Sequence, residues 1–279
     1  MGKIDDIQAY KEWTEYHRSL KRDKAADNLS PVERKKKLEK LEANVIEWIL
    51  FFFSEFAKYP FTKFHKKAIK RITTNMEWYE VLSWSRELAK STIVFMCMMY
   101  LVLTGKKKNV LLISNSHENA VRLLEPYKKA FESNSMLKAY YGDLREFGSW
   151  TADEFTLTTG ATFRAIGALE SPRGTRKDAV RPDTALVDDF DTDADCRNPD
   201  ILKKKWEWFE EALFPTRSIS EDLLVIFCGN LIALDCCVKR AGDKADHWDI
   251  VNIRDKDGKS SWPEKNKEES INSIQSKIS

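Results

Sequence analysis

Residues 84–92 read Trp-Ser-Arg-Glu-Leu-Ala-Lys-Ser-Thr and form the segment best suited to chemistry. Their spacing is that of a phosphate-binding loop, G-x-x-x-x-G-K-[ST], in which backbone N–H groups hold phosphates, the lysine reaches the β/γ oxygens and the hydroxyl binds Mg²⁺. Trp84 stands at the first glycine position and Ala89 at the second, whereas the following Lys-Ser-Thr is intact. We therefore predict that the nucleotide is bound by Ser85, Arg86, Glu87, Leu88, Ala89, Lys90, Ser91 and Thr92.

A second motif lies far downstream, where the apolar run 184–187 ends in two carboxylates, Asp188 and Asp189. Hydrolysis of a nucleoside triphosphate needs a metal ligand and also a base, because water is a poor nucleophile until a base lies within hydrogen-bond reach. We assign Mg²⁺ binding to Ser91 and Asp188, and activation of water to Asp189, although glutamate is more usual there. The simpler alternatives are a helix start that happens to contain Lys-Ser-Thr and a solvated acidic strand end.

The same acidic stretch also invites a calcium-loop interpretation, since aspartates alternate from 189 to 195. The pattern lacks the glycine at position 6, where Ala194 stands, and Asp200 replaces the bidentate glutamate at position 12. Calcium is therefore the weaker hypothesis.

Arginines surround the two motifs. Arg86 precedes the loop lysine by four residues and is placed to clamp the γ-phosphate. A basic loop before the acidic strand offers a guanidinium to its own nucleotide or to that of a neighbouring subunit, as an arginine finger does. We assign Arg86 and Arg176 to the catalytic set, and the candidate fingers are Arg173, Arg176 and Arg181. The alternative for this loop is a basic surface without a ligand.

Two further residues lie where a nucleotide would be sensed. Asn230 follows the apolar strand 223–228 and is a candidate for coupling loss of the γ-phosphate to movement. His65, between phenylalanines upstream of the first strand, is a candidate for contact with adenine. The alternative for His65 is simple packing against its aromatic neighbours.

The elements that must position these residues alternate along the chain. Ser30-Pro31 marks a helix start, and helical sequence continues to about residue 57. Helices are expected at 90–103, 116–131 and 199–213, and strands at 79–84, 109–114, 154–159, 162–167, 184–190 and 223–228. Apolar strands that lack alternation and are separated by helices indicate a parallel sheet covered on both faces. The fold class is α/β: a P-loop NTPase with a mainly parallel central sheet flanked by helices, plus an N-terminal helical segment. We divide the chain into a helical or lid segment (1–57), an ATPase core (58–245) and a linker (246–279).

Composition supports a substantial core and excludes some classes. Hydrophobic residues make up 42% of the 279, with nine tryptophans and fifteen phenylalanines, and the net charge of +2 implies no polyanion partner by itself. The five cysteines lack C-x-x-C spacing, which favours reduced thiols, and no histidine lies at ligand spacing from Cys236 and Cys237. The longest apolar runs, 46–53 and 93–103, fall short of the roughly 20 residues that span a bilayer. No membrane association and no signal peptide are expected.

Together these motifs resemble the large terminase subunits that package DNA into the heads of tailed bacteriophages. The loop with Arg86 and its tolerated alanine is similar to the family's glycine-poor Walker A. The segments Arg173-Gly174 and Arg181-Pro182-Asp183 resemble the family's approach to Walker B, and the stretch ending in Asn230 resembles its coupling motif. His65 falls near the adenine-recognition segment, where glutamine is often seen. The resemblance covers about residues 58 to 262.

The resemblance implies an ATPase motor that uses ATP and Mg²⁺ and translocates double-stranded DNA into a procapsid. It implies a homo-oligomeric ring on the portal protein, a small terminase subunit as partner, and action in the host cytoplasm. Such proteins usually continue into a nuclease domain, and this sequence ends near the point where that domain would begin. The resemblance therefore does not lead us to expect DNA cleavage from this chain. The alternatives are a helicase-like remodelling ATPase, which would need a second motor domain, and a nucleotide-degenerate assembly scaffold.

Overall fold

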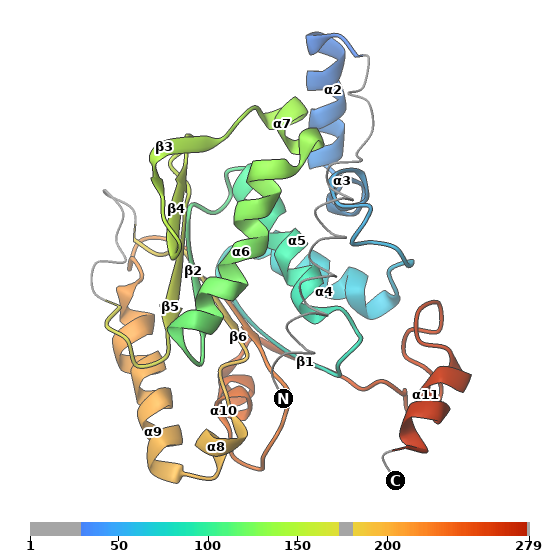
Figure 1. Ribbon diagram of the computed structural model, residues 1–279, viewed down its shortest axis with the longest axis vertical. Coiled ribbons are helices and arrows are strands. Elements are labelled where there is room, and N and C mark those ends of the chain that lie inside the picture. The colour runs from blue at the N-terminus through green and yellow to red at the C-terminus, as the bar shows by residue number, and fades with distance from the viewer. Residues whose placement is uncertain (1–28, 173–180, 278–279) are drawn as a thin grey trace.

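In the part of the chain that the structure describes, eight strands form one mixed sheet in the order β3-β4-β5-β2-β6-β7-β1-β8 (Figure 1). The computed structural model describes residues 29–172 and 181–277. In the order of the sheet, all neighbouring strands from β5 through β2, β6, β7 and β1 to β8 are parallel. At the other edge, β4 pairs antiparallel with both β3 and β5. The strands are β1 Trp78–Trp84, β2 Asn109–Ser114, β3 Arg145–Trp150, β4 Glu154–Leu157, β5 Thr162–Gly167, β6 Thr184–Asp188, β7 Leu224–Cys228 and β8 His247–Val251.

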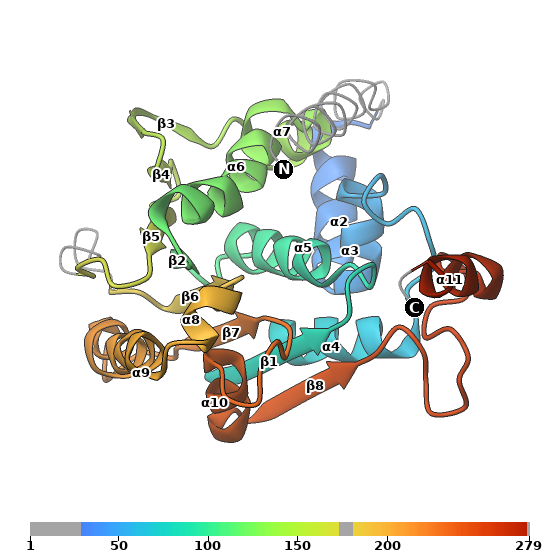
Figure 2. The same ribbon diagram turned by 60° about the horizontal axis from the view of Figure 1, so that its bottom comes forward.

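Helices cover both faces of this sheet (Figures 1 and 2). One face packs against α3, α4, α5 and α6, and the other against α9 and α10. The helices are α2 Pro31–Glu42, α3 Val45–Phe52, α4 Lys63–Thr74, α5 Lys90–Leu103, α6 His117–Ser133, α7 Ser135–Tyr141, α8 Asp193–Cys196, α9 Pro199–Glu207, α10 Cys237–Lys244 and α11 Glu268–Gln275. A π-helix, Trp208–Leu213, and a 3₁₀ turn, Phe214–Thr216, follow α9.

Side chains alternate between the two faces, so each central strand contributes to two hydrophobic clusters. In β6, Leu186 packs in the cluster under α5, while Ala185 and Val187 pack in the cluster under α9 and α10. All five residues of β6 are buried. A strand buried on both faces reads as a continuous apolar run, which explains why the sequence lacks alternation. The predicted α/β architecture is confirmed.

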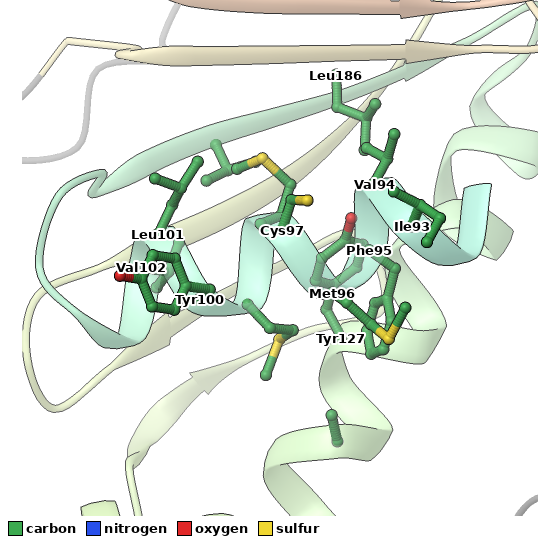
Figure 3. Close-up of a cluster of buried hydrophobic side chains, with 14 of the residues drawn as sticks. Ile93, Val94, Phe95, Met96, Cys97, Tyr100, Leu101, Val102, Tyr127 and Leu186 are labelled. Carbon is green, nitrogen blue, oxygen red and sulfur yellow. The ribbon is translucent and has the colours of Figure 1, made fainter. Parts of the chain in front are cut away.

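Helix α5 is the central helix of the first layer. Every residue from 93 to 102 is buried, as expected for a helix that is apolar on all sides. Figure 3 shows Val94 near Leu186 of the sheet and Phe95 near Tyr127 of α6, and the Phe95 and Tyr127 rings lie 5.0 Å apart. The first turn of the helix, which carries Lys90, is thereby fixed over the carboxyl edge of the sheet.

The structure corrects several expected boundaries. The helical sequence expected up to residue 57 forms two helices that end at Phe52, because Asn44 accepts hydrogen bonds from the backbone N–H groups of Ile46 and Glu47 and starts α3. Ser30 caps α2 as predicted. The helix expected at 199–213 changes to π geometry at Trp208.

The largest difference concerns the segment predicted as a linker. Strand β8 pairs in parallel with β1, so the sheet extends beyond the boundary expected at residue 245. The side chains of β8 are only partly buried or exposed, because it is an edge strand, and the apolar signal is correspondingly weak. Within the described residues, no helix is both long and apolar enough to cross a bilayer.

Candidate functional site

The carboxyl ends of β1, β6 and β7 lie side by side and open into one pocket of about 540 Å³. This edge of a parallel sheet is where α/β proteins bind their ligands. The pocket brings together residues from four separate parts of the chain, namely Trp84, Ser85, Arg86, Glu87, Ala89, Lys90, Ser91, Thr92, Asp188, Asp189, Asn230 and Lys265.

The loop keeps its turn without glycine. Glu87 and Ala89 both have left-handed backbones, with φ of 71° and 58°. This conformation costs an ordinary residue about 1–2 kcal/mol, which is why glycine is usual here. Trp84 is the last residue of β1 and is 1% exposed, so its ring belongs mainly to the core. The loop proper is residues 85–89, and we call it the phosphate loop.

The acidic strand end meets the first turn of α5 directly. Ser91 Oγ donates a hydrogen bond to Asp188 Oδ2 at 2.7 Å, although the two residues are 97 positions apart. Burial, and next the charge of Asp189, raise the pKa of Asp188 to about 6. A hydroxyl beside a buried carboxylate suits Mg²⁺, which commonly takes one or two carboxylates and completes its shell with water and phosphate. Among residues 29–172 and 181–277, no group of three or more His, Cys, Asp or Glu gathers to hold a metal.

Lys90 also lines the pocket, and its positive charge lowers the pKa of Asp188 against the larger effect of burial. In the described part of the chain its ammonium group has no hydrogen-bonded or ionic partner. Lys90 is the first residue of α5, where the helix dipole favours anions. A cation in this position is available to a ligand.

Asp189 lies just beyond the strand, exposed and with a left-handed φ of 48°. Its carbonyl accepts from Asn115 Nδ2 at 2.9 Å, and its N–H donates to Asp188 Oδ1 at 3.1 Å. The backbone of the assigned base is therefore held at both ends. Sequence reasoning missed Asn115, although a polar residue directly after β2, the strand beside β6, was a usable signal.

Asn230 reaches the pocket from the end of β7, in the place expected for a coupling residue. The preceding Gly229 is needed for close packing, because a Cβ there would lie 2.3 Å from Val238 of α10. The approach of α10 thus fixes the loop that carries Asn230.

The arginines assigned from the sequence differ in their position relative to the pocket. Arg86 lines the pocket and is exposed. Arg181 precedes β6, so it lies at the opposite end of the sheet from Asp188, separated by a five-residue strand of about 16 Å. The expectation that Arg181 serves the pocket of its own chain is not supported. Arg173 and Arg176 lie outside the described residues.

His65 is not in the pocket but behind the phosphate loop. Its side chain is fully buried, Nε2 lies 3.0 Å from the carbonyl oxygen of Leu88, and Nδ1 lies 3.0 Å from Thr62 Oγ1. Burial lowers the pKa of His65 to about 4, so the ring is neutral near pH 7. The expected contact with adenine is replaced by support of the loop backbone, because the ring has no surface to offer a base.

Two aspartates of the calcium hypothesis, Asp191 and Asp195, already have partners within the protein. Asp191 accepts hydrogen bonds from the N–H groups of Cys237 and Val238 at the start of α10. Asp195 forms an ion pair with Lys205 at 2.8 Å. These contacts are structural.

Lys265 is the second residue that sequence reasoning missed. It belongs to the segment predicted as a linker, yet it lines the pocket beside the phosphate loop. Only the return of the chain after β8 brings it there, and no local pattern marks it.

Comparison with known proteins supports the fold. No family model and no curated protein match this sequence. The crystal structure of the large terminase of bacteriophage HK97 matches with a TM-score of 0.50 and 13% sequence identity. The match covers 79% of this chain and 48% of that protein, so this chain spans about half the length of the HK97 large terminase. At such low identity the likeness concerns the fold alone: the chain shares with the HK97 large terminase an α/β fold in which helices flank a mixed sheet.

Proposed function

We propose that this chain is the ATPase part of a motor that packages double-stranded viral DNA into a procapsid. The hydrogen bond from Ser91 to Asp188 carries the proposal, because it joins a lysine-serine loop to an acidic strand end at the ligand edge of the sheet. The fold shared with the HK97 large terminase supports the choice among ATPase classes.

In this proposal ATP binds with Mg²⁺, which neutralises phosphate charge and polarises the γ-phosphate. The N–H groups of the phosphate loop and the Lys90 ammonium bind the phosphates, and Arg86 adds a second positive charge. Ser91 and Asp188 hold the metal. Asp189 orients water and accepts its proton, and Asn230 couples loss of the γ-phosphate to movement.

The proposed partners follow from the motor role. They are double-stranded DNA, the portal protein, the small terminase subunit and further copies of this chain in a ring, all in the host cytoplasm. Arg173 and Arg176 remain candidates for a finger that acts on a neighbouring subunit, which would make hydrolysis depend on protein concentration. We do not propose nuclease activity for these residues.

The test is phosphate release with Mg²⁺–ATP, measured with and without DNA over a range of protein concentrations. Lys90→Ala should lower turnover by about 10²- to 10³-fold, the usual effect of removing one preorganised charge-stabilising group. Lys36→Ala, on the exposed face of α2, is the matched control and should leave turnover unchanged. Equal turnover in the Lys90→Ala variant would remove the assignment.

A thermal shift with a non-hydrolysable ATP analogue separates the motor from a scaffold that has lost nucleotide binding. At 100 times its dissociation constant, a ligand adds about 2.7 kcal/mol of stability. Absence of any shift in the wild-type chain would favour the scaffold. A helicase-like remodeller would bind the analogue equally, but would separate DNA strands rather than move a duplex.

A further inference from the structure

The chain segment after β8, residues 252–267, returns to the phosphate loop. Its anchor is Trp262, which is 5% exposed and donates a hydrogen bond from Nε1 to the carbonyl of Pro60 at 3.0 Å. The Trp262 ring lies 4.5 Å from the ring of His65, centroid to centroid. Since His65 contacts the carbonyl of Leu88, the segment is packed against the residue that supports the loop from behind.

Lys265 extends from this anchor to the mouth of the pocket. Its Nζ donates to the carbonyl oxygen of Glu87 at 2.8 Å and to Glu87 Oε2 at 2.9 Å. The same side chain lines the pocket together with Lys90 and Ser91. A lysine ammonium has three N–H donors, and the contacts to Glu87 use two.

The ion pair with Glu87 is weakly held. The Lys265 side chain is 25% exposed and that of Glu87 is 69% exposed, and pairs of this kind contribute little because water competes. A bound triphosphate would present several negative oxygens to the same ammonium, with more total negative charge than the single carboxylate of Glu87, and so a stronger attraction. The exchange of Glu87's carboxylate for a phosphate oxygen is therefore favourable.

We propose that Lys265 is a second lysine of the nucleotide site, which donates to a phosphate oxygen while keeping its hydrogen bond to the carbonyl of Glu87. The inference rests on the proposed function and adds a residue to it from outside the two motifs. It also makes the position of segment 252–267 depend on whether nucleotide is bound.

The experiment measures affinity for Mg²⁺ with a non-hydrolysable ATP analogue by calorimetry. Lys265→Met should weaken binding about tenfold, equivalent to about 1.4 kcal/mol. The loss should persist when Lys265→Met is introduced into the Glu87→Gln variant, because the contact is with the ligand and not with the carboxylate. Lys265→Arg, which retains a positive charge, should bind within about threefold of the wild type.

Two controls separate this contact from long-range charge and from support of the loop. Lys267→Met removes the same charge from an exposed position two residues away. Asn266→Ala removes the other donor to the Glu87 carbonyl, at 3.4 Å, without a change of charge. Both should stay within about twofold of the wild type.

The outcomes are distinct. If the loss caused by Lys265→Met disappears in the Glu87→Gln background, or if Asn266→Ala reproduces it, Lys265 only braces the loop and the inference is overturned. If the wild type binds and Lys90→Ala abolishes binding while Lys265→Met has no effect, this inference alone fails. If the wild type does not bind the analogue, the proposed function fails with it.

Discussion

The two ends of the central sheet use the same residue types in opposite ways. At the amino end, Lys107 is 2% exposed and its Nζ donates to three backbone carbonyls, those of Met76, Asp183 and Asp222, at 2.9 to 3.1 Å. At the carboxyl end, Lys90 has no such acceptor among the described residues and faces the pocket. One lysine completes the fold, and the other is left for a ligand.

The aspartates that flank β6 repeat this contrast. Asp183, before the strand, accepts hydrogen bonds from the N–H groups of Lys108 and Asn109 and from the hydroxyl of Thr184. Asp188, the last residue of the strand, accepts from Ser91 and from its own neighbour Asp189. Burial raises the pKa of both carboxyls. Asp183 borders a smaller pocket that Lys106, Lys107 and Lys108 also line, whereas Asp188 borders the pocket at the phosphate loop, where a bound cation would offset the cost of burying its charge.

This comparison gives a way to tell a structural charge from a functional one. A buried charged group with every hydrogen-bonding position filled stabilises a connection between chain segments. A charged group at the pocket, by contrast, has hydrogen-bonding positions that no protein group fills. It lies beside the left-handed backbone of Glu87, Ala89 and Asp189, and strained backbone of this kind is typical of functional sites. The predictions below test that division.

Replacing Lys107 should have the largest effect on stability. Lys107→Met roughly keeps the length of the side chain but removes the Lys107 donor from the carbonyls of Met76 and Asp222, and one of two donors from that of Asp183, which keeps the N–H of Leu224. We therefore expect a loss of about 3 kcal/mol in the free energy of unfolding. The measurement is urea unfolding. Lys108→Met, its exposed neighbour, should change stability by less than about 0.5 kcal/mol. A Lys107→Met variant as stable as the wild type would contradict the structural role of this end of the sheet.

Replacing Asp188 should stabilise the protein without ligand while it removes metal binding. The pKa of Asp188 in the fold, about 6, lies above the ordinary 3.8, so the folded state holds its proton more tightly. The wild type therefore loses stability as pH rises from about 4 to about 6, and Asp188→Asn should be more stable by about 2–3 kcal/mol above pH 6. Unfolding in EDTA at pH 4, 5, 6 and 7 would check this. If the free energy of unfolding changed with pH in the same way for the two proteins, Asp188 would not be a buried charge that destabilises the fold.

Support behind the phosphate loop should be lost in acid. The pKa of His65 in the fold is about 4, below the ordinary 6.5, so stability is complete above pH 6.5 and falls between there and pH 4. The contribution of His65 should drop by about 2 kcal/mol between pH 7 and pH 5. His65→Gln should remove this dependence, as measured by unfolding at both values. An equal pH dependence in the variant would show that protonation of the His65 ring does not cause the loss of stability in acid.

Relief of loop strain should give the smallest effect. Ala89→Gly places glycine at a left-handed position, so we expect a gain of about 0.5–1 kcal/mol in stability. Ala139→Gly, inside α7, should instead lose about 1 kcal/mol, because glycine is unfavourable within a helix. Thermal denaturation of the two variants gives the comparison. A loss at position 89 would mean that the left-handed turn is not strained.

Local signals were sufficient for the elements that meet at the site. Helix 90–103 and strand 109–114 were predicted to the residue, because each is a continuous apolar run with a clear start. The pair Ser91 and Asp188 was predicted because lysine-serine after a strand and aspartate after a strand each have a known chemical use. The structure brings these residues together as expected.

Residues positioned by distant contacts were not predicted. Lys265 reaches the pocket because β8, which was expected to be part of a linker, pairs with β1 and brings the following segment back to the phosphate loop. His65 carried an aromatic context that suits both a base and a core, and the contact with Leu88 that decides between them comes from folding. In each case the deciding contact lies far away in the sequence.

The pairing of β8 has a mechanical consequence. Five residues of β8 are matched with Glu80 to Trp84, and the carbonyl of Val251 accepts from the N–H of Ser85 at 2.8 Å. A pull on the chain beyond Val251 runs along the strand axis, so it loads the ladder bonds together in shear instead of unzipping them one by one. Tension applied there would reach Ser85, the first residue of the phosphate loop, before β8 could detach.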